Sequence, residues 1–255
     1  MLFSEIIYGP IHSRRLGVSL GVNLMPRDSK LCSFDCIYCE CGFNRRVLQP
    51  QLPTADEFCL ALQQKLEELS EAGVVIQTIT FSGNGEPTMH PDFAGIVSSC
   101  VQLRNHYCPK AAVTVLSNST QLYRKEVLEA LRKVDNRVLK LDSAIDSTMR
   151  LIDQPLNPEL TVADIKGYLS QFDGDFTLQT CFLKGETRGQ VIDNTTDVEL
   201  EAWYSTVEQL RPRQVMIYVI DRKTPVETLK KIPAEKMNQI GDVLRGKGFD
   251  VVVSA

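Results

Sequence analysis

Hydrophobic residues along this chain follow two spacings that alternate from one segment to the next. Short apolar runs rich in β-branched residues predict strands, and longer segments with an apolar residue every three or four positions predict helices. The predicted strands cover residues 18–24, 75–81, 112–116, 138–142, 176–182, 214–220 and 249–253. The predicted helices cover a segment that starts at Thr54 and the segments 92–105, 121–133, 161–171, 196–210 and 234–246. The segments 40–53 and 183–195 are predicted to be long loops.

The helix that starts at Thr54 carries the clearest local signals. Thr54 and Glu57 have the spacing of a capping box, in which each side chain bonds the backbone N–H of the other residue. The apolar residues that follow lie on one helix face, and Gly73 comes after the last of them as a stop signal. That face consists of Phe58, Leu62, Leu66 and Leu69.

Strands and helices that alternate in this way predict parallel strands joined by right-handed crossovers, in an open sheet or in a barrel. Several strands place small or polar residues on one face; Ser19, Gly21 and Asn23, for example, alternate with apolar neighbours. A sheet covered on both sides is apolar on both faces, so this pattern favours a partly closed barrel around a ligand, unless these are edge strands. We predict an α/β fold, an incomplete parallel (β/α)6 barrel, in one domain over residues 1–255, with 224–255 completing the barrel edge.

Net charge and the length of the apolar runs exclude some classes of function for this protein. The chain has 255 residues with 28 Lys and Arg against 32 Asp and Glu, and this net charge of −4 excludes a broad basic surface for nucleic acid. No apolar run reaches the roughly 18 residues that a membrane span needs. The first residues also lack the basic and apolar regions of a secretory signal. We therefore expect a cytoplasmic protein with no membrane partner.

Three of the eight cysteines, Cys32, Cys36 and Cys39, fall within eight residues, and Cys41 follows directly. In a reducing compartment such a group indicates a metal site more than a disulfide. A structural zinc site needs four ligands, which Cys41 would have to complete. A four-iron cluster held by three thiolates keeps one iron open, where a substrate or cofactor can bind. Both interpretations remain open on spacing alone, and the zinc interpretation predicts a structural or adaptor protein.

The three cysteines, with Tyr38 before the last of them, resemble the cluster-binding loop of the radical S-adenosylmethionine (radical SAM) superfamily. Residues 82–86, Ser-Gly-Asn-Gly-Glu, are similar to the glycine-rich motif of that family, and residues 117–120 to its ribose-contacting segment. Residues 9–17 and 217–222 resemble a subgroup related to wyosine-tRNA synthases. The resemblance implies that Cys32, Cys36 and Cys39 hold one [4Fe-4S] cluster. It further implies that the reduced cluster cleaves S-adenosylmethionine to a 5′-deoxyadenosyl radical, which abstracts hydrogen from an unidentified substrate.

The resemblance also implies roles for residues at the predicted strand ends. Gly83 and Gly85 would let the backbone approach the methionyl group closely, while Asn84 and Glu86 would accept hydrogen bonds from its ammonium group. The backbone around Tyr38 would meet adenine. The residues expected to bind the cofactor are Tyr38, Ser82, Gly83, Asn84, Gly85, Glu86, Ser117, Asn118 and Asp142.

Lys140 and Asp142 lie on the same face of the predicted strand 138–142. They form either a buried ion pair or a pair of catalytic groups that face the substrate. An unpaired buried lysine is costly, so we expect Lys140 to have an acidic partner.

The substrate stays open. A wyosine-like tRNA base modification follows from the resemblance, but the chain has no cysteine before Cys32 to hold the second cluster of the archaeal enzymes, and its net charge is −4. A second option is the modification of a small molecule or a peptide, which suits a compact chain. An electron donor such as flavodoxin or ferredoxin is the expected protein partner.

Overall fold

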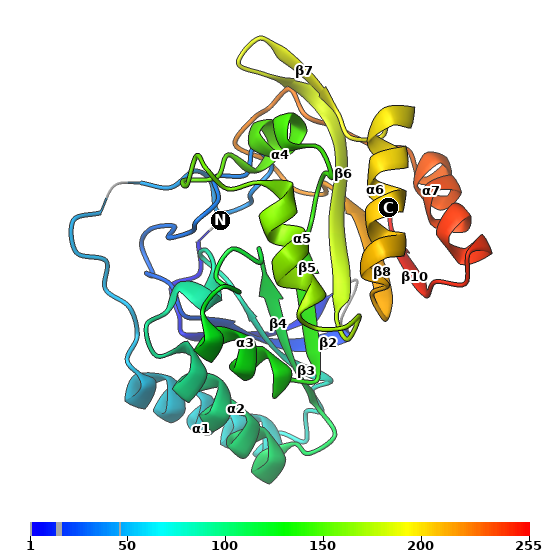
Figure 1. Cartoon of the computed structure of the whole chain (residues 1–255). Coiled ribbons are helices and arrows are strands. Elements are labelled where there is room, and N and C mark those ends of the chain that lie inside the picture. The colour runs from blue at the N-terminus through cyan, green and yellow to red at the C-terminus, as the bar shows by residue number, and fades with distance from the viewer. Residues whose placement is uncertain (1, 14–16, 46) are drawn as a thin grey trace. The chain divides into compact units, whose positions relative to one another are not determined.

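The structure is a computed structural model that describes residues 2–13, 17–45 and 47–255 (Figure 1). Residues 14–16, which belong to the motif at 9–17, lie outside the described residues. The chain divides into two compact units. The first comprises Met1–Cys32 and Asn44–Arg137, and the second comprises Ser33–Phe43 and Val138–Ala255. The single domain expected from the sequence stays a prediction.

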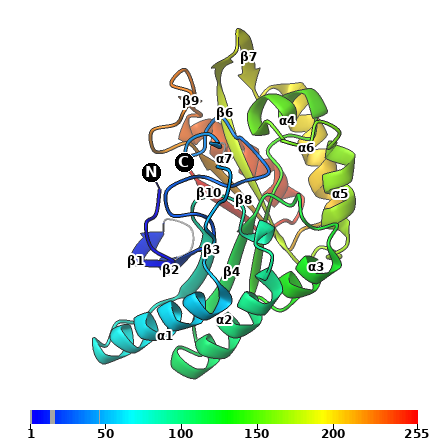
Figure 2. The same ribbon diagram turned by 90° about the vertical axis from the view of Figure 1, so that its left-hand side faces the viewer.

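The first unit contains four neighbouring strands in the order β1-β2-β3-β4. The β1 and β2 strands are antiparallel, whereas β2, β3 and β4 are parallel to one another. Helix α2 packs between α1 and α3, and Figure 2 shows α1 and α2 side by side. The elements are β1 (Ile7–Ser13), β2 (Gly17–Asn23), α1 (Ala55–Glu71), β3 (Thr78–Ser82), the 3-10 helix η1 (Pro87–Met89), α2 (Phe93–Tyr107), β4 (Ala112–Ser117) and α3 (Lys125–Arg132).

Helix α1 confirms the local signals of the sequence. The Thr54 side chain accepts a hydrogen bond of 3.2 Å from Glu57 N, and the Glu57 carboxylate accepts one of 2.7 Å from Thr54 N. The predicted face is the buried one. The helix ends at Glu71, and Gly73 follows it with a φ of 66°.

The polar face of β2 and β3 is explained by paired hydroxyl groups. Ser19 Oγ lies 2.8 Å from Thr80 Oγ1, and Thr78 Oγ1 lies 2.8 Å from Thr114 Oγ1 on β4. All four residues are buried. Because both strands have a neighbour on each side, they are not edge strands, and hydroxyl pairs satisfy the polar groups that a buried sheet would otherwise leave unbonded.

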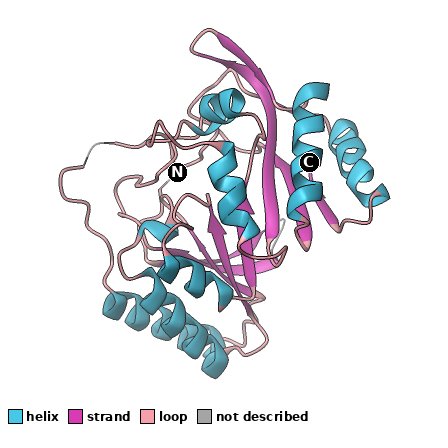
Figure 3. Ribbon diagram, in the orientation of Figure 1, coloured by secondary structure: helices cyan, strands magenta, loops and turns pink. Residues whose placement is uncertain are grey.

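The second unit contains the parallel strands β5, β6, β8 and β10 in that order. The boundary between the units falls within β5. Figure 3 shows helices α6 and α7 beside the strands of this unit. The elements are β5 (Asn136–Lys140), α4 (Asp146–Asp153), α5 (Val162–Ser170), β6 (Thr177–Thr187), β7 (Gln190–Asp193), α6 (Asp197–Leu210), β8 (Gln214–Val219), β9 (Lys230–Lys231), α7 (Ala234–Gly246) and β10 (Val251–Ser254).

The prediction of a long loop at 183–195 is wrong. Strand β6 continues to Thr187 and turns into β7, with which it pairs antiparallel. The turn falls at Arg188 and Gly189, whose φ angles are 50° and 73°, and a two-residue turn with positive φ joins twisted strands well. On β7, Ile192 is buried and Val191 is exposed, so the strand pattern is present but too short to stand out in the sequence.

No helix among the described residues is long and apolar enough to span a bilayer.

Candidate functional site

Glu86 joins two of the predicted cofactor segments within the first unit. It is buried, and its carboxylate accepts hydrogen bonds from Ser117 Oγ at 2.8 Å and from Asn118 N at 2.6 Å. The same carboxylate caps η1 by accepting from Thr88 N and Oγ1. Burial raises the pKa of Glu86, against the opposing effect of these hydrogen bonds. The glycine-rich turn and the segment at 117–118 are therefore held together by one carboxylate.

The glycine-rich turn also holds the residue that precedes the cysteines. Leu31 N donates to Asn84 O at 3.0 Å, and Glu86 N donates to Leu31 O at 3.1 Å. Between these two bonds Gly85 has a φ of 151°, and a Cβ at this position would lie 1.8 Å from Leu31 O. Only glycine permits this close approach. Next to Leu31, the Cys32 sulfur accepts a hydrogen bond of 3.5 Å from Asn118 Nδ2.

Asn84 is engaged with the N-terminal segment. Its side-chain oxygen accepts from Phe3 N at 2.8 Å, and its amide nitrogen donates to Phe3 O at 2.8 Å and to Pro26 O at 2.7 Å. Ser82 Oγ shares a hydrogen bond of 2.6 Å with the Tyr8 hydroxyl. These two predicted cofactor residues therefore bond neighbouring parts of the first unit, and their contact with a cofactor stays a prediction.

The second unit holds the remaining cysteines of the motif. Cys36 is buried, Cys39 is half-buried, and Ile37 between them belongs to a buried apolar cluster with Ile152 and Cys181. Ile37 N donates to Ile152 O at 2.9 Å. The loop is thus fixed by both its backbone and its apolar side chain.

A buried polar network surrounds Asp142, directly after β5. The Tyr38 hydroxyl donates to Asp142 Oδ2 at 2.5 Å, and Lys140 Nζ lies 3.0 Å from the same oxygen. Lys140 also forms an ion pair with Asp153 and lies 4.8 Å from the centre of the Phe34 ring. The predicted acidic partner of Lys140 is confirmed, and Asp153 is an additional one that sequence reasoning missed.

The charges in this network shift one another's pKa values. Burial alone would lower the pKa of Lys140, but the two adjacent carboxylates raise it well above its ordinary value. Burial raises the pKa of Asp153, while the Lys140 ammonium opposes that rise. Burial and the Asp142 carboxylate raise the pKa of Tyr38. Lys140 is therefore held as the ammonium form, and Tyr38 as the neutral hydroxyl.

Two further residues missed by sequence reasoning fix the end of β5. Asn194 Nδ2 donates to Asp142 O and Cys181 O, each at 2.9 Å. Glu199, in the first turn of α6, accepts from Ser143 Oγ at 2.7 Å and from Thr148 Oγ1 at 2.5 Å. Each residue lies about 50 positions from its partner at the end of β5, so spacing along the chain gives no signal of either contact.

Within residues 2–13, 17–45 and 47–255, no group of three or more His, Cys, Asp or Glu side chains is arranged to hold a metal ion. In a four-iron cluster each thiolate binds a different iron, so its ligands do not meet at one point. The donor chemistry fits such a cluster, because three thiols lie within eight residues and Cys32 and Cys36 are each only 9% exposed. The absence of a side chain at Gly85 lets the turn pack directly against Leu31, the residue before Cys32. The three cysteines as iron ligands stay a prediction.

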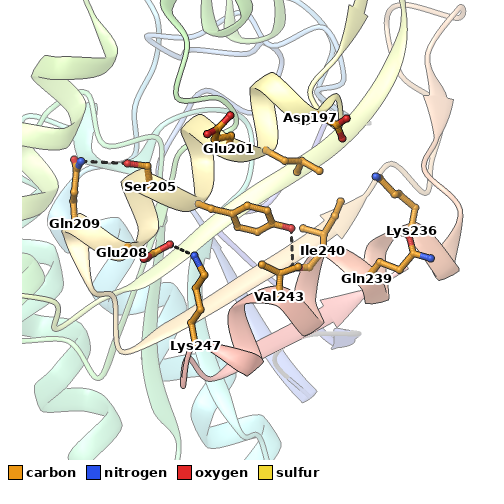
Figure 4. Close-up of a pocket in the computed structure, with 12 residues that line it drawn as sticks. Asp197, Glu201, Ser205, Glu208, Gln209, Lys236, Gln239, Ile240, Val243 and Lys247 are labelled. Carbon is orange, nitrogen blue, oxygen red and sulfur yellow. Dashed lines mark hydrogen bonds and ion pairs between the residues drawn. The ribbon is translucent and has the colours of Figure 1, made fainter.

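A surface groove of about 810 Å³ lies between α6 and α7 in the second unit (Figure 4). Its lining contains Tyr204, whose hydroxyl donates to Ile240 O at 3.2 Å, and the ion pair of Lys247 with Glu208. None of the site residues predicted from the sequence lines this groove.

The sequence model of the radical SAM superfamily matches residues 28–193, which contain the cysteine motif, the glycine-rich turn and Lys140 to Asp153. This chain belongs to the radical SAM superfamily. Membership implies an iron–sulfur cluster and S-adenosylmethionine as the cofactors of the domain. The family predicted from the sequence is thereby confirmed.

Individual proteins similar to this radical SAM chain include one sequence relative and two solved structures. A protein named GTPase Obg from Brachyspira hyodysenteriae is 29% identical over 93% of this chain, which spans 33% of that protein. A radical SAM methyltransferase from Sphaerobacter thermophilus has a TM-score of 0.64 at 16% identity, covering 92% of this chain and 65% of the other. A structure of TYW1 with a lysine-pyruvate adduct bound has a TM-score of 0.63 at 11% identity, covering 89% and 73%. The two structures show the fold, and the predicted incomplete α/β barrel of radical SAM type is confirmed.

Proposed function

We propose that this chain is a radical SAM enzyme in which Cys32, Cys36 and Cys39 each bind one iron of a [4Fe-4S] cluster, and the fourth iron binds S-adenosylmethionine. When bound, the reduced cluster would supply the one electron that breaks a C–S bond of S-adenosylmethionine, giving methionine and a 5′-deoxyadenosyl radical. The observation that carries the proposal is the family match over residues 28–193, which contains all three cysteines.

The first unit contributes the residues proposed to bind S-adenosylmethionine beside Cys32. Glu86 keeps the turn at Gly83 and Gly85 bonded to Ser117 and Asn118. These groups supply backbone and side-chain polar atoms to the methionyl and ribose parts of the cofactor. Ser82 and Asn84 complete the proposed set within the same turn.

In the second unit, Lys140 and Asp142 are the proposed catalytic pair, and Asp142 with Tyr38 is proposed to contact the cofactor as well. The two carboxylates beside Lys140 keep the proton on Nζ. A protonated lysine in a buried network donates hydrogen bonds and stabilises negative charge on a substrate, and it does not act as a base there. We propose that this pair orients a substrate whose hydrogen is abstracted.

The substrate is proposed only as a class: a small molecule, a peptide or a tRNA base. A reductant such as flavodoxin or ferredoxin is the proposed protein partner. Incubation with tRNA at low salt tests the nucleic-acid option directly. A salt-sensitive gel shift supports a tRNA substrate, and no shift at low salt counts against it.

The experiment that tests the proposal is an oxygen-free purification followed by iron and sulfide analysis and an assay for 5′-deoxyadenosine. We expect brown protein that absorbs at about 400 nm. Cys36→Ala should lose the cluster and the 5′-deoxyadenosine. Cys59→Ala, a half-buried cysteine of α1, is the matched control and should keep both. Colourless protein with stoichiometric zinc would favour the structural adaptor and contradict the proposal.

A further inference from the structure

The cysteine motif is paired along its backbone with the residues at the end of α4. Asp35 N donates to Asp153 O at 2.8 Å, and Leu156 N donates to Ser33 O at 2.9 Å. Phe34 and Pro155 form an antiparallel bridge between these two bonds. One segment, residues 152–156, therefore holds residues 33–37 along most of their length.

The end of α4 explains why this segment accepts hydrogen bonds. The last carbonyl groups of a helix have no partner inside the helix and need one outside it. Gln154 ends α4 in the left-handed conformation, with φ 44° and ψ 63°. The Ile152 and Asp153 carbonyls are bonded by Ile37 N and Asp35 N. The backbone around Cys36 thus supplies the donors that cap α4.

The side chain of Asp153 reaches the same motif by a second route. Its carboxylate forms an ion pair with Lys140, which lies 3.0 Å from Asp142 Oδ2. Tyr38, two residues after Cys36, donates to that oxygen at 2.5 Å. Asp142 and Asp153 are each only 1% exposed. Buried charges are costly without partners, so movement of one member of this network disturbs the others.

We propose that Asp153 is a positioning residue for the cysteine motif: its carbonyl fixes Asp35, and its carboxylate fixes Tyr38 through Lys140 and Asp142. Cys36 lies between these two fixed points, and Cys39 follows the second. Asp153 thereby sets the backbone that presents two of the three proposed iron ligands. The effect on a cluster rests on the proposed function, whereas the effect on the loop itself does not.

The test uses the full chain and the variant Asp153→Asn, which keeps the size and the backbone carbonyl but removes the charge. We expect amide hydrogen exchange of peptides covering 33–43 to accelerate by at least about tenfold in apoprotein, since breaking a buried ion pair has a large cost. In reconstituted protein we expect lower iron content and an altered EPR signal of the reduced cluster. Glu208→Gln breaks the half-exposed ion pair with Lys247 in the same unit and should change neither readout.

The outcomes separate this proposal from the proposed function. Unchanged exchange at 33–43 overturns the positioning role, whether or not the wild type holds a cluster. Accelerated exchange in a wild-type background that never binds iron supports the positioning role and contradicts the proposed function. If exchange accelerates but the EPR signal is unchanged, Asp153 orders the loop only in the apoprotein. That result overturns its role in positioning the cysteines that bind iron.

A second comparison covers the case in which Asp153→Asn loosens the whole unit. Because the carboxylate acts favourably through Lys140, adding Asp153→Asn to Lys140→Gln should not accelerate exchange at 33–43 any further. Without Lys140 the Asp153 carboxylate only repels the nearby Asp142 carboxylate, so its removal should leave exchange unchanged or slow it. A further acceleration in the double variant shows that the carboxylate acts by another route and contradicts the proposal.

Discussion

The Tyr38 hydroxyl donates a hydrogen bond of 2.5 Å to Asp142 Oδ2. This bond joins a residue of the cysteine motif to the end of β5, 104 positions later in the chain. Asp142 Oδ1 in turn accepts from Cys181 N at 2.9 Å, so the carboxylate also engages β6. A single buried carboxylate therefore connects the motif to two parallel strands.

Tyr38→Phe should lower the free energy of unfolding by about 1 to 3 kcal/mol, because it removes a donor from a buried carboxylate. Urea unfolding of apoprotein measures the change. Tyr107→Phe is the matched control, since Tyr107 makes a bond of 2.7 Å to Glu67 at the surface. Its effect should stay within about 0.5 kcal/mol. Equal losses in the two variants would mean that burial of the Tyr38 bond contributes nothing.

Gly85→Ala should destabilise the protein by about 1 to 3 kcal/mol and displace the segment before Cys32. The added Cβ would lie 1.8 Å from Leu31 O, and a φ of 151° is also unfavourable for alanine. Unfolding and hydrogen exchange of residues 28–32 are the measurements. Gly167→Ala provides the contrast, because Gly167 is in α5 with open space at its Cβ. That variant should be about 0.5 to 1 kcal/mol more stable.

Glu86→Gln should change how stability depends on pH. Burial raises the pKa of Glu86 above its ordinary 4.5, so the folded state binds the proton more tightly than the unfolded state. The stability that this proton binding contributes is complete below the ordinary value and is lost as the pH rises through the raised pKa. The variant lacks this titration. The free energy of unfolding of the variant, relative to that of the wild type, should therefore increase with rising pH. Urea unfolding from acid to neutral pH measures this difference. A constant difference would contradict the pKa direction.

Thr54→Ala should lower the free energy of unfolding by about 1 kcal/mol, because the first turn of α1 loses its cap. The hydrogen bonds from Thr54 lower the pKa of Glu57 below its ordinary value. The contribution of the capping box is present above that ordinary value and is lost as the pH falls through the lowered pKa. Urea unfolding at neutral and acid pH should show that the difference in free energy of unfolding between wild type and variant is smaller in acid. A gap that widens in acid would rule out this cap.

The predicted pairing of Lys140 with an acidic residue shows that a sequence pattern can predict contacts between residues a few positions apart. Lys140 and Asp142 are two positions apart, and a strand places such residues on one face, so their contact is implied by the sequence. Asp153 lies on a separate helix that has few apolar positions, and no local spacing connects it to Lys140. Asn194 and Glu199 were missed for the same reason, since their partners at the end of β5 are about 50 residues away.

The sequence by itself determined α1, most strands and helices of both units, and the grouping of three cysteines beside Tyr38. These features depend on residues a few positions apart, whose backbone geometry and side-chain chemistry need no other part of the chain. Tertiary structure alone decided that β6 continues into the hairpin with β7 and that hydroxyl pairs fill the polar face of β2 and β3. It also decided that Asp153 bonds the backbone of the cysteine motif. The hairpin depends on pairing with a strand whose own pattern is too short to stand out in the sequence. The other two depend on which buried polar groups meet across the fold, because every such group requires a partner that spacing along the chain does not specify.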